Sequence, residues 1–323
     1  MSAEGAAAVD DLVINTAALE PLFAPWEEPD RHRVRASTPG QPPEVKTYRR
    51  RSPVRLVNSL REAVKEWRDL GYPGASGTTQ QLLRHWFERP HRLPDGIGGD
   101  IEFRYYFCQR EAIETFVYLI EVRQIRTLSG MLADFGGPTG ELEASGINPE
   151  DELWARYAFK LATGAGKTKC MSLAMVWSYF HALREGSDMP RHFVAVAPNL
   201  TVFERLKEDF RPEGGGPDIF AKDPLIPPEW QGDWNFSVVL QDETGGATTG
   251  GVLYLTNIHR LFDSREGRGK EAETYPWAGP VVSKTKALNT GEELRDRITA
   301  HRRVLVFNDE AHHVWDPGSA WNQ

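Results

Sequence analysis

The sequence LATGAGKTKC, residues 161–170, joins a short apolar run, YAFKL (157–161), to the longer run MSLAMVWSYFHAL (171–183). The first run predicts a β-strand, and the second predicts a helix because its apolar residues recur at helical spacing. The expected apolar face of that helix consists of Leu173, Val176, Trp177 and Phe180. A glycine-rich turn in this setting is either a simple connection or a loop that holds phosphate groups.

A triphosphate-binding loop needs inward-pointing N–H groups, Gly where a Cβ would collide, a Lys for the β- and γ-phosphates and a hydroxyl for Mg²⁺. Gly164, Gly166, Lys167 and Thr168 supply these features in order. A following helix would direct its N-terminal dipole at the anion. The general pattern GxxxxGK[ST] has Gly at the position of Leu161, so the turn with a solvent-facing Lys stays open at this point. The nucleotide-binding candidates are Thr163, Gly164, Ala165, Gly166, Lys167 and Thr168.

A second motif, VLVFNDEAHHVW (304–315), places Asp309 and Glu310 directly after an apolar run. We expect this run to be a central strand, and ligands of open α/β sheets bind at the carboxyl ends of the strands. Mg²⁺-dependent hydrolysis uses one carboxylate near the metal and another that orients or deprotonates water. Asp309 suits the first role and Glu310 the second. An acidic strand end that caps the next helix is the alternative, but both motifs in this order are much rarer by accident than either one alone.

Length and composition indicate a globular protein with roughly two domains, or one large domain with an appendage. Of the 323 residues, 40% are apolar and 26% are charged, and no uninterrupted apolar stretch approaches the length of a membrane span. The N-terminus MSAEGAAAVDD lacks the features of a signal peptide, so we predict a cytoplasmic protein without a membrane anchor. Two cysteines, Cys108 and Cys170, exclude a disulfide framework and a CxxC zinc site. The net charge of −8 does not decide whether nucleic acid binds.

Three regions follow along the chain. Residues 1–55 predict an irregular N-terminal arm, residues 56–100 a small helical region, and residues 101–323 an α/β lobe with a mostly parallel sheet. The strands are expected at YAFKL, HFVAVAP, SVVL, VLYLT and VLVFN, and they alternate with helical patterns. Further expectations are a helix in EAIETFVYLIEV, a capping box of Thr201 with Glu204, and loops or insertions at 130–149, 211–236 and 263–290.

Four segments carry a resemblance to superfamily 2 helicases and translocases. ATGAGKT (162–168) and DEAH (309–312) resemble their motifs I and II, and APNLTVFERLKEDF (197–210) is similar to motif Ia. LTNIHRLF (255–262) resembles a following strand and turn, less specifically. The resemblance implies a RecA-like P-loop NTPase lobe of the DEAD/DEAH-box type.

Two upstream segments narrow the resemblance. FRYYFCQREAIETFVYLIEV (103–122) is similar to the segment before motif I in the helicase subunit of type III restriction enzymes. APWEEPDRH (24–32) and RRRSP (49–53) also resemble the N-terminal arm of that group. The resemblance implies ATP and Mg²⁺ as cofactors, duplex DNA as partner, and ATP hydrolysis that drives movement on DNA. Lys167 would hold phosphates, Thr168 and Asp309 would organise the metal, and Glu310 would activate water.

The resemblance also implies roles outside motifs I and II. Gln109 would recognise the adenine edge, with Phe107 or Tyr106 nearby, or else it is a surface residue at a helix start. His312 would couple nucleotide state to a partner domain, or else it is a core or capping histidine. Asn199 and Thr201 are the candidate nucleic-acid contacts, together with the loop at 241–250.

Parts of such an enzyme lie beyond this sequence, so we expect an N-terminal fragment or a truncated reading frame. The second RecA-like lobe, its arginine finger and a nuclease domain are missing, and a methyltransferase subunit is a further expected partner. An arginine finger contributes about 10³ to 10⁵ in rate in related phosphoryl-transfer systems. The chain alone is therefore expected to hydrolyse ATP very slowly.

Two other functions stay open. One is a fragment of an RNA helicase or chromatin-type remodeller. The other is a non-hydrolysing module that binds nucleic acid or a partner through its basic arm, whose arginines are Arg49, Arg50, Arg51 and Arg55. A nuclease spelling, Pro29-Asp30 with Glu44 to Lys46, is rejected because prolines between the two halves argue against paired strands.

Overall fold

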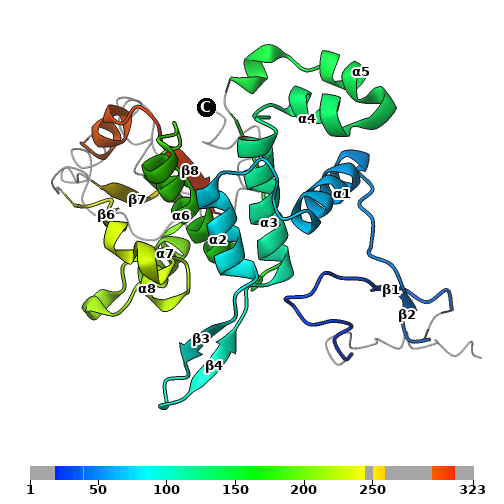
Figure 1. Ribbon diagram of the computed structural model, residues 1–323, viewed down its shortest axis with the longest axis horizontal. Helices are drawn as coiled ribbons and strands as arrows, with labels where there is room; N and C mark the ends of the chain where they lie inside the picture. Colours follow the sequence, from blue (N-terminus) through cyan, green and yellow to red (C-terminus); the bar gives the residue numbers. More distant parts are fainter. Residues whose placement is uncertain (1–18, 39, 154, 244–249, 259–292, 310–323) are drawn as a thin grey trace, which may run out of the picture.

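The computed structural model describes residues 19–38, 40–153, 155–243, 250–258 and 293–309 (Figure 1). Its strands are β1 (His32–Val34), β2 (Glu44–Lys46), β3 (His91–Pro94), β4 (Asp100–Phe103), β5 (His192–Ala197), β6 (Phe236–Leu240), β7 (Gly251–Asn257) and β8 (Leu305–Asn308). Its α-helices are α1 (Arg55–Asp69), α2 (Gly77–Phe87), α3 (Phe107–Val117), α4 (Leu128–Phe135), α5 (Gly140–Ser145), α6 (Lys167–Glu185), α7 (Leu200–Phe210) and α8 (Ile219–Lys222). Both cysteines are free thiols. Of the helices described, none combines the length and apolar character that a bilayer crossing requires.

The main sheet confirms the predicted parallel α/β class. Within the described residues it has four strands in the order β6-β7-β5-β8, and every neighbouring pair is parallel. Each strand is therefore reached through a crossover, so the carboxyl ends of all four lie at one edge of the sheet. Asp309, directly after β8, lies at this edge beside the end of β5.

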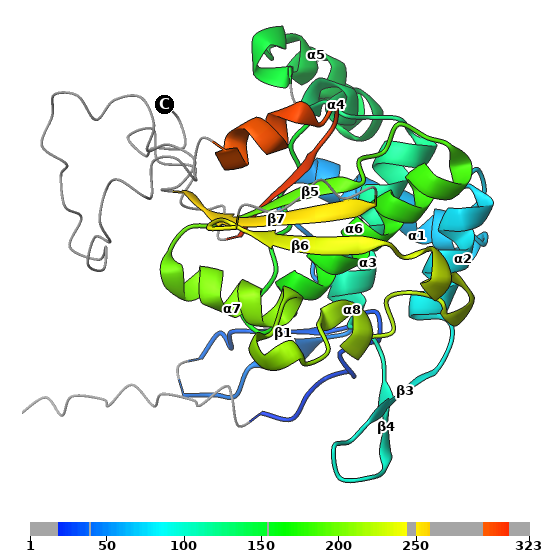
Figure 2. The same cartoon turned by 90° about the vertical axis from the view of Figure 1, so that its left-hand side faces the viewer.

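The two faces of the sheet bury two different cores. Along β5, Phe193, Ala195 and Ala197 face the large core that also contains buried residues of α6 and α7. Val194 and Val196 face a smaller core that includes Leu294. Figure 2 shows the consequence: α7 lies on one side of the strands, and the helical residues 293–300 lie on the other. This two-layer burial is the reason the strands read as almost continuously apolar.

Helix α6 runs through the middle of the molecule. All its residues from Cys170 to Phe180 are buried, which corrects the expectation of a single apolar face. The helix contacts the sheet on one side and α2 and α3 on another. Trp177 packs edge-to-face on Phe116 at 5.6 Å and donates its indole N–H to the Thr79 hydroxyl at 2.8 Å. A helix enclosed in this way holds the loop before it in a fixed position.

The predicted strand YAFKL is wrong. Residues 157–161 are extended and their burial alternates, but no strand is assigned there. Their side chains pack on α3 instead, because Tyr157 and Phe159 lie edge-to-face on Phe116 at 5.5 and 5.9 Å. Alternating burial needs only an extended backbone, whereas a strand also needs a hydrogen-bonded neighbour. As a result β8, expected to be central, lies at the edge of the described sheet, with Val306 exposed.

Two segments expected to be loops or insertions contain helices. Residues 130–149 contain most of α4 and all of α5, whose glycines serve close packing: a Cβ on Gly136 or Gly140 would lie 2.4 or 2.1 Å from the Leu132 carbonyl oxygen. Residues 211–236 are not a surface loop, because they contain α8 and bury Phe220 and Trp230 in the core. Glycine therefore marks tight packing in the first segment, and buried aromatic side chains place the second segment in the core. The predicted loop 263–290 lies outside the described residues.

Two antiparallel hairpins were not predicted. β1 pairs with β2 inside the N-terminal arm, and β3 pairs with β4 in a hairpin that projects from the helices in Figure 1. The helix after β5 was predicted, but its cap was not. Asn199, not Thr201, is the N-cap, because its side-chain oxygen accepts the Val202 N–H at 3.0 Å. The domain boundaries near residues 55 and 100 stay predictions.

Candidate nucleotide site

The glycine-rich turn before α6 has the backbone form that a phosphate-binding loop requires. Gly164 and Gly166 adopt φ of 80° and 81°, a region that favours glycine, and Ala165 N–H donates to the Ala162 carbonyl at 3.1 Å. Gly166 is the N-cap of α6, so Lys167 begins the helix. The N–H groups of a first helical turn have no partner within the helix, and the helix dipole adds positive potential beside this loop.

Gln109 holds this loop against the start of α3. Its side-chain oxygen accepts the Tyr106 N–H at 2.9 Å, and its side-chain nitrogen donates to the Ala165 carbonyl at 2.8 Å. The residue is 2% exposed. A Cβ at Gly166 would lie 2.3 Å from the Gln109 nitrogen, so only glycine fits beneath this amide. Adenine recognition by Gln109 stays a prediction, and both ends of its amide already bind main chain.

Lys167 and Asp309 lie together at the carboxyl edge of the sheet. Asp309 follows β8, continues its pairing by donating its N–H to the Val196 carbonyl, and is 5% exposed. The Lys167 ammonium lies 3.8 Å from one carboxylate oxygen, and the Arg205 guanidinium lies 2.6 Å from the other. A buried carboxylate is costly without such partners, so both cations stabilise its charged form.

Helix α7 adds two residues that the sequence analysis missed. Arg205 pairs with Asp309, and the Thr168 hydroxyl hydrogen-bonds to the Asp209 carboxylate. Burial raises the pKa of Asp209 above its ordinary value, while the Thr168 bond and the charge of Arg205 lower it. The signal was present in the sequence, because Arg205 and Asp209 are four residues apart and so share one face of the helix. It could be recognised only once α7 was placed beside the loop.

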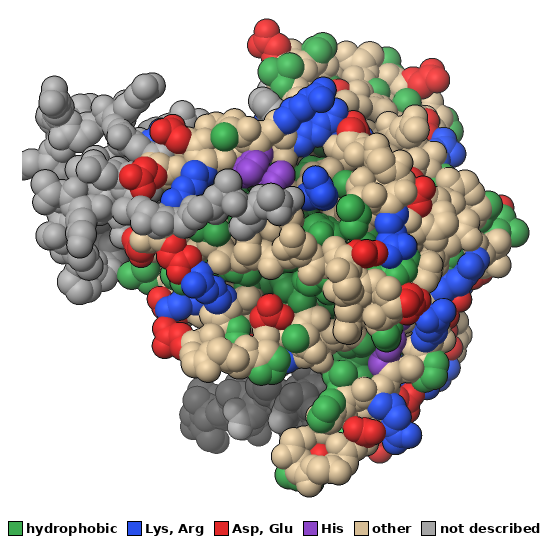
Figure 3. All heavy atoms as spheres, turned by 60° about the vertical axis from the view of Figure 1, so that its left-hand side comes forward, with side chains coloured by type: hydrophobic (Ala, Val, Ile, Leu, Met, Phe, Trp, Pro, Cys, Tyr) green, Lys and Arg blue, Asp and Glu red, His purple; other side chains and the backbone are tan. Residues whose placement is uncertain are grey.

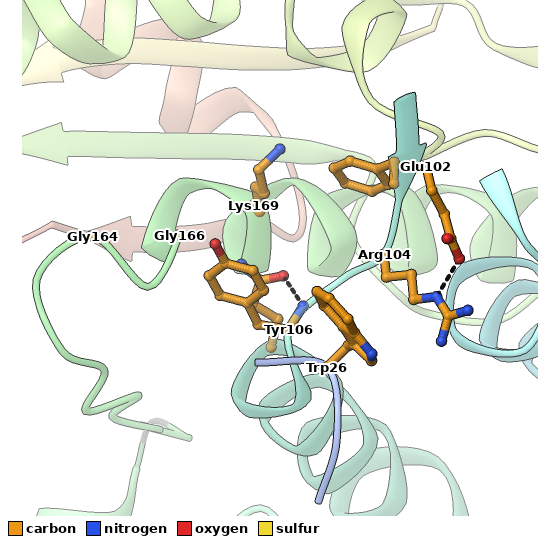
Figure 4. A pocket seen from close by; sticks show the side chains of 9 residues that line it. Trp26, Glu102, Arg104, Tyr106, Gly164, Gly166 and Lys169 are labelled. Atoms are coloured by element: carbon orange, nitrogen blue, oxygen red, sulfur yellow. Dashed lines mark hydrogen bonds and ion pairs between the residues drawn. The ribbon is translucent and has the colours of Figure 1, made fainter. Parts of the chain in front are cut away.

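A pocket of about 330 Å³ opens beside the loop (Figure 4). Gly164 and Gly166 form one end, and the aromatic side chains of Phe103, Tyr106 and Trp26 contribute to the rest. Its size is at the lower end of the range for small-molecule pockets. Glu102, Arg104 and Lys169 add charged groups to the lining. The pocket therefore joins an apolar, aromatic compartment to an anion-binding loop.

Of the two aromatic residues proposed beside Gln109, only Tyr106 lines this pocket. Phe107 is 6% exposed and lies under the guanidinium groups of Arg49 and Arg68, at 5.4 and 5.1 Å from the ring centre. Its ring thus faces the N-terminal arm. Consecutive residues at a helix start point in different directions. The sequence alone could not tell that Tyr106 would line the pocket and that Phe107 would be buried.

The remaining site candidates fall into two groups. Glu310, His312 and most of the 241–250 loop lie outside the described residues. Asn199 and the exposed Thr201 lie at the carboxyl end of β5, at the same edge of the sheet as Asp309. Asn199 has a structural role as the N-cap, and its contact with nucleic acid stays a prediction, as does that of Thr201.

The basic arm is partly neutralised within the chain. Arg49 makes a two-pronged ion pair with Glu111, at 2.7 Å for both contacts, and Arg51 pairs with Glu62. On the face shown in Figure 3, Lys and Arg side chains alternate with acidic ones and form no continuous stripe. These contacts weigh against the arm as a nucleic-acid surface.

The structure also rejects the nuclease-like pattern of Pro29-Asp30 with Glu44 to Lys46, but not because the two halves fail to pair. Glu44 to Lys46 does form a strand paired with His32 to Val34, and the prolines lie in the connection. The register places Glu44 opposite Val34, whereas Asp30 lies beyond the other end of the hairpin. Across the described part of the chain, no cluster of three or more His, Cys, Asp or Glu side chains could hold a metal.

The site nevertheless suits a magnesium nucleotide. Mg²⁺ usually keeps several waters and is bound by one or two carboxylates plus the phosphates of the ligand, so it needs no protein cage. Thr168 and Asp309 are the side chains that would hold it. Gly164 leaves room for phosphate oxygens, since no atom lies within 4 Å of a Cβ placed there.

A comparison with known families gives one match. The model for the type III restriction enzyme, res subunit, matches residues 100–323, which is more than half of the chain. The matched segment contains the loop, Gln109, α7 and Asp309. No curated protein and no solved structure matches the chain.

Proposed function

The chain belongs to the family of the type III restriction enzyme res subunit, and on that premise we propose that it binds ATP with Mg²⁺ and hydrolyses it to move on duplex DNA. Membership of the family makes residues 100–323 an ATP-dependent helicase-like domain with a RecA-like P-loop fold. The single observation that supports the proposal best is the 3.8 Å separation of Lys167 from Asp309 beside the positive-φ glycines.

Each residue has a role that its position supports. Lys167 and the loop N–H groups would hold the β- and γ-phosphates. Thr168 and Asp309 would hold Mg²⁺, directly or through its water, and Glu310 would orient the attacking water. Bound Mg²⁺ supplies a cation that neutralises charge on the transferred phosphoryl group. Arg205 pairs with Asp309 and helps to orient its carboxylate.

Nucleotide binding is tested by titrating the protein with a fluorescent ADP analogue in the presence of Mg²⁺. Lys167→Ala should weaken binding about 10- to 100-fold, because a hydrogen bond to a charged group contributes about 1.5–3 kcal/mol. Lys160→Ala is the matched control, since Lys160 is an exposed lysine seven residues earlier. Equal affinities of the two variants would refute the assignment of the loop.

Movement on DNA is tested by ATP turnover with duplex DNA or RNA of the same sequence. Stimulation by duplex DNA supports the proposal, and stimulation by RNA alone supports an RNA helicase instead. Affinity for DNA should fall linearly with log salt concentration, because contacts to phosphates release counterions. A role in a type III restriction system adds a nuclease domain and a methyltransferase subunit as partners, which co-purification from cells would detect.

A further inference from the structure

We propose that Trp26, from the N-terminal arm, is a wall of the nucleoside end of the nucleotide site, so that the arm is part of the site. This inference rests on the proposed binding of ATP and names a residue 141 positions before Lys167. It assigns the aromatic compartment of the pocket to the base and sugar. The glycine end of the pocket would then face the phosphates.

Two anchors fix Trp26 in place. On one side, the Pro25 carbonyl accepts the Phe107 N–H at 2.8 Å, which ties the arm to the first residue of α3. On the other side, Glu28 pairs with Lys65 at 2.6 Å and lies within 3.6 Å of Arg49 and Arg68. Anchors on both sides of Trp26 hold its backbone beside the start of α3. The arm is therefore docked at this point.

The anchored segment is also joined to α3 through charge. Arg49 binds both Glu28 and Glu111, and Arg68 binds both Glu28 and the buried Glu114. These ion pairs are partly buried, so salt screens them less than it screens exposed pairs. The arm and α3 thus behave as one unit on the pocket side of the molecule.

The compartment has the chemistry of a nucleoside pocket. Figure 4 shows Trp26 and Tyr106 on the same side of the opening, with Arg104 next to Trp26. Trp26 is 44% exposed and Tyr106 39% exposed, so each ring keeps surface available for another molecule. The Arg104 guanidinium lies 5.7 Å from the Trp26 ring centre and can orient it. Bases bind well to such surfaces because every base has a π-face.

Two polar side chains of the pocket, Gln109 and Lys169, already have partners within the chain. The Gln109 amide is bonded at both ends to main chain, and Lys169 is paired with Asp223 while its ammonium lies 5.0 Å from the Phe103 ring centre. Affinity for the nucleoside should therefore come mainly from aromatic contact. Trp26 is the part of that contact that the arm supplies.

The test compares two ligands in the same variants of the full chain. Mg²⁺-ADP contains the nucleoside, whereas inorganic tripolyphosphate engages the phosphate loop alone. Trp26→Ala should weaken Mg²⁺-ADP binding about tenfold, in the range measured when a base-stacking aromatic is replaced by alanine, and leave tripolyphosphate binding unchanged. Trp26→Phe should retain most of the affinity because it keeps an aromatic face. Isothermal titration calorimetry measures both ligands.

Tyr48→Ala is the matched control, because Tyr48 is an exposed aromatic of the same arm that does not line the pocket. It should leave both affinities unchanged. Equal binding of Mg²⁺-ADP by wild type and Trp26→Ala would overturn the inference and leave the proposed function intact. Failure of the wild-type chain to bind either ligand would overturn the proposed function itself, and the inference with it. Loss of both ligands in Trp26→Ala alone would also overturn the inference, since the indole would then support the whole loop.

Discussion

Replacing Gly166 by alanine should damage the loop through two separable effects. The first is backbone strain, since φ of 81° costs a non-glycine residue about 1–2 kcal/mol. The second is a collision, because the new Cβ would lie 2.3 Å from the Gln109 side-chain nitrogen. That nitrogen can move only by giving up its bond to the Ala165 carbonyl. Leaving a buried polar group unsatisfied costs about 1–3 kcal/mol, so the total should be about 2–5 kcal/mol.

Gly164→Ala separates the two effects. Gly164 has nearly the same φ, 80°, but nothing lies within 4 Å of a Cβ placed there. It should therefore lose only the backbone contribution of about 1–2 kcal/mol. Gln109→Ala removes the collision, so Gly166→Ala in that background should cost no more than Gly164→Ala does in the wild type.

The assay is urea denaturation of the four variants and the wild type, with the free energy of unfolding compared at equal slope. A double-mutant cycle between Gly166→Ala and Gln109→Ala should give a coupling of about 1–3 kcal/mol. Additive losses of unfolding free energy in the double variant, or equal losses in the two glycine variants, would show that Gln109 does not pack against Gly166. Either result would refute the packing described above.

Three further outcomes are expected. In urea denaturation, Glu114→Ala should lower the free energy of unfolding by about 3–5 kcal/mol, because two arginines lose the buried carboxylate with which they pair. Glu62→Ala, which removes an exposed ion pair, should lower it by less than about 1 kcal/mol. Burial lowers the pKa of His85 to about 4 from an ordinary 6.5, so the unfolded chain binds this proton at a higher pH than the folded chain does. The free energy of unfolding should therefore fall as the pH drops from 6.5 toward 4. In urea titrations across this pH interval, His85→Gln should make that decline smaller. Arg205→Ala should lower the free energy of unfolding by about 1–2 kcal/mol, because it removes one cation that pairs with Asp309. Adding Asp309→Asn should restore part of this stability, since the charge that lost its partner is removed. A fully additive loss of stability in the double variant would contradict the ion pair.

Local sequence was enough to predict the glycine-rich turn, the helix after it and the four strands of the main sheet in their chain order. Gly164, Gly166, Lys167 and Thr168 were predicted from residue type and spacing within a few positions, and such information is contained in the chain itself. The same holds for β5, β6, β7 and β8, whose apolar runs predicted a parallel sheet.

Glycine and proline residues were the least reliable indicators of where loops lie. Gly136 and Gly140 were interpreted as loop residues, but they allow α4 and α5 to approach closely. The alternation in residues 157–161 predicted a strand, although those side chains pack on α3 without a hydrogen-bonded partner. In each case the residue type was compatible with two environments, and the neighbours decided between them.

Some residues of the candidate site were predictable from local sequence, and others only from the folded structure. Residue identity alone predicted Lys167 and Asp309, because their roles require a particular functional group after a particular pattern. Arg205, Asp209 and Trp26 could be found only in three dimensions, since Arg205 contacts Asp309, Asp209 contacts Thr168 and Trp26 lines the pocket, each from a distant part of the chain. Contacts between such elements depend on how helices and sheet pack, and packing is a property of the whole folded chain rather than of any short segment.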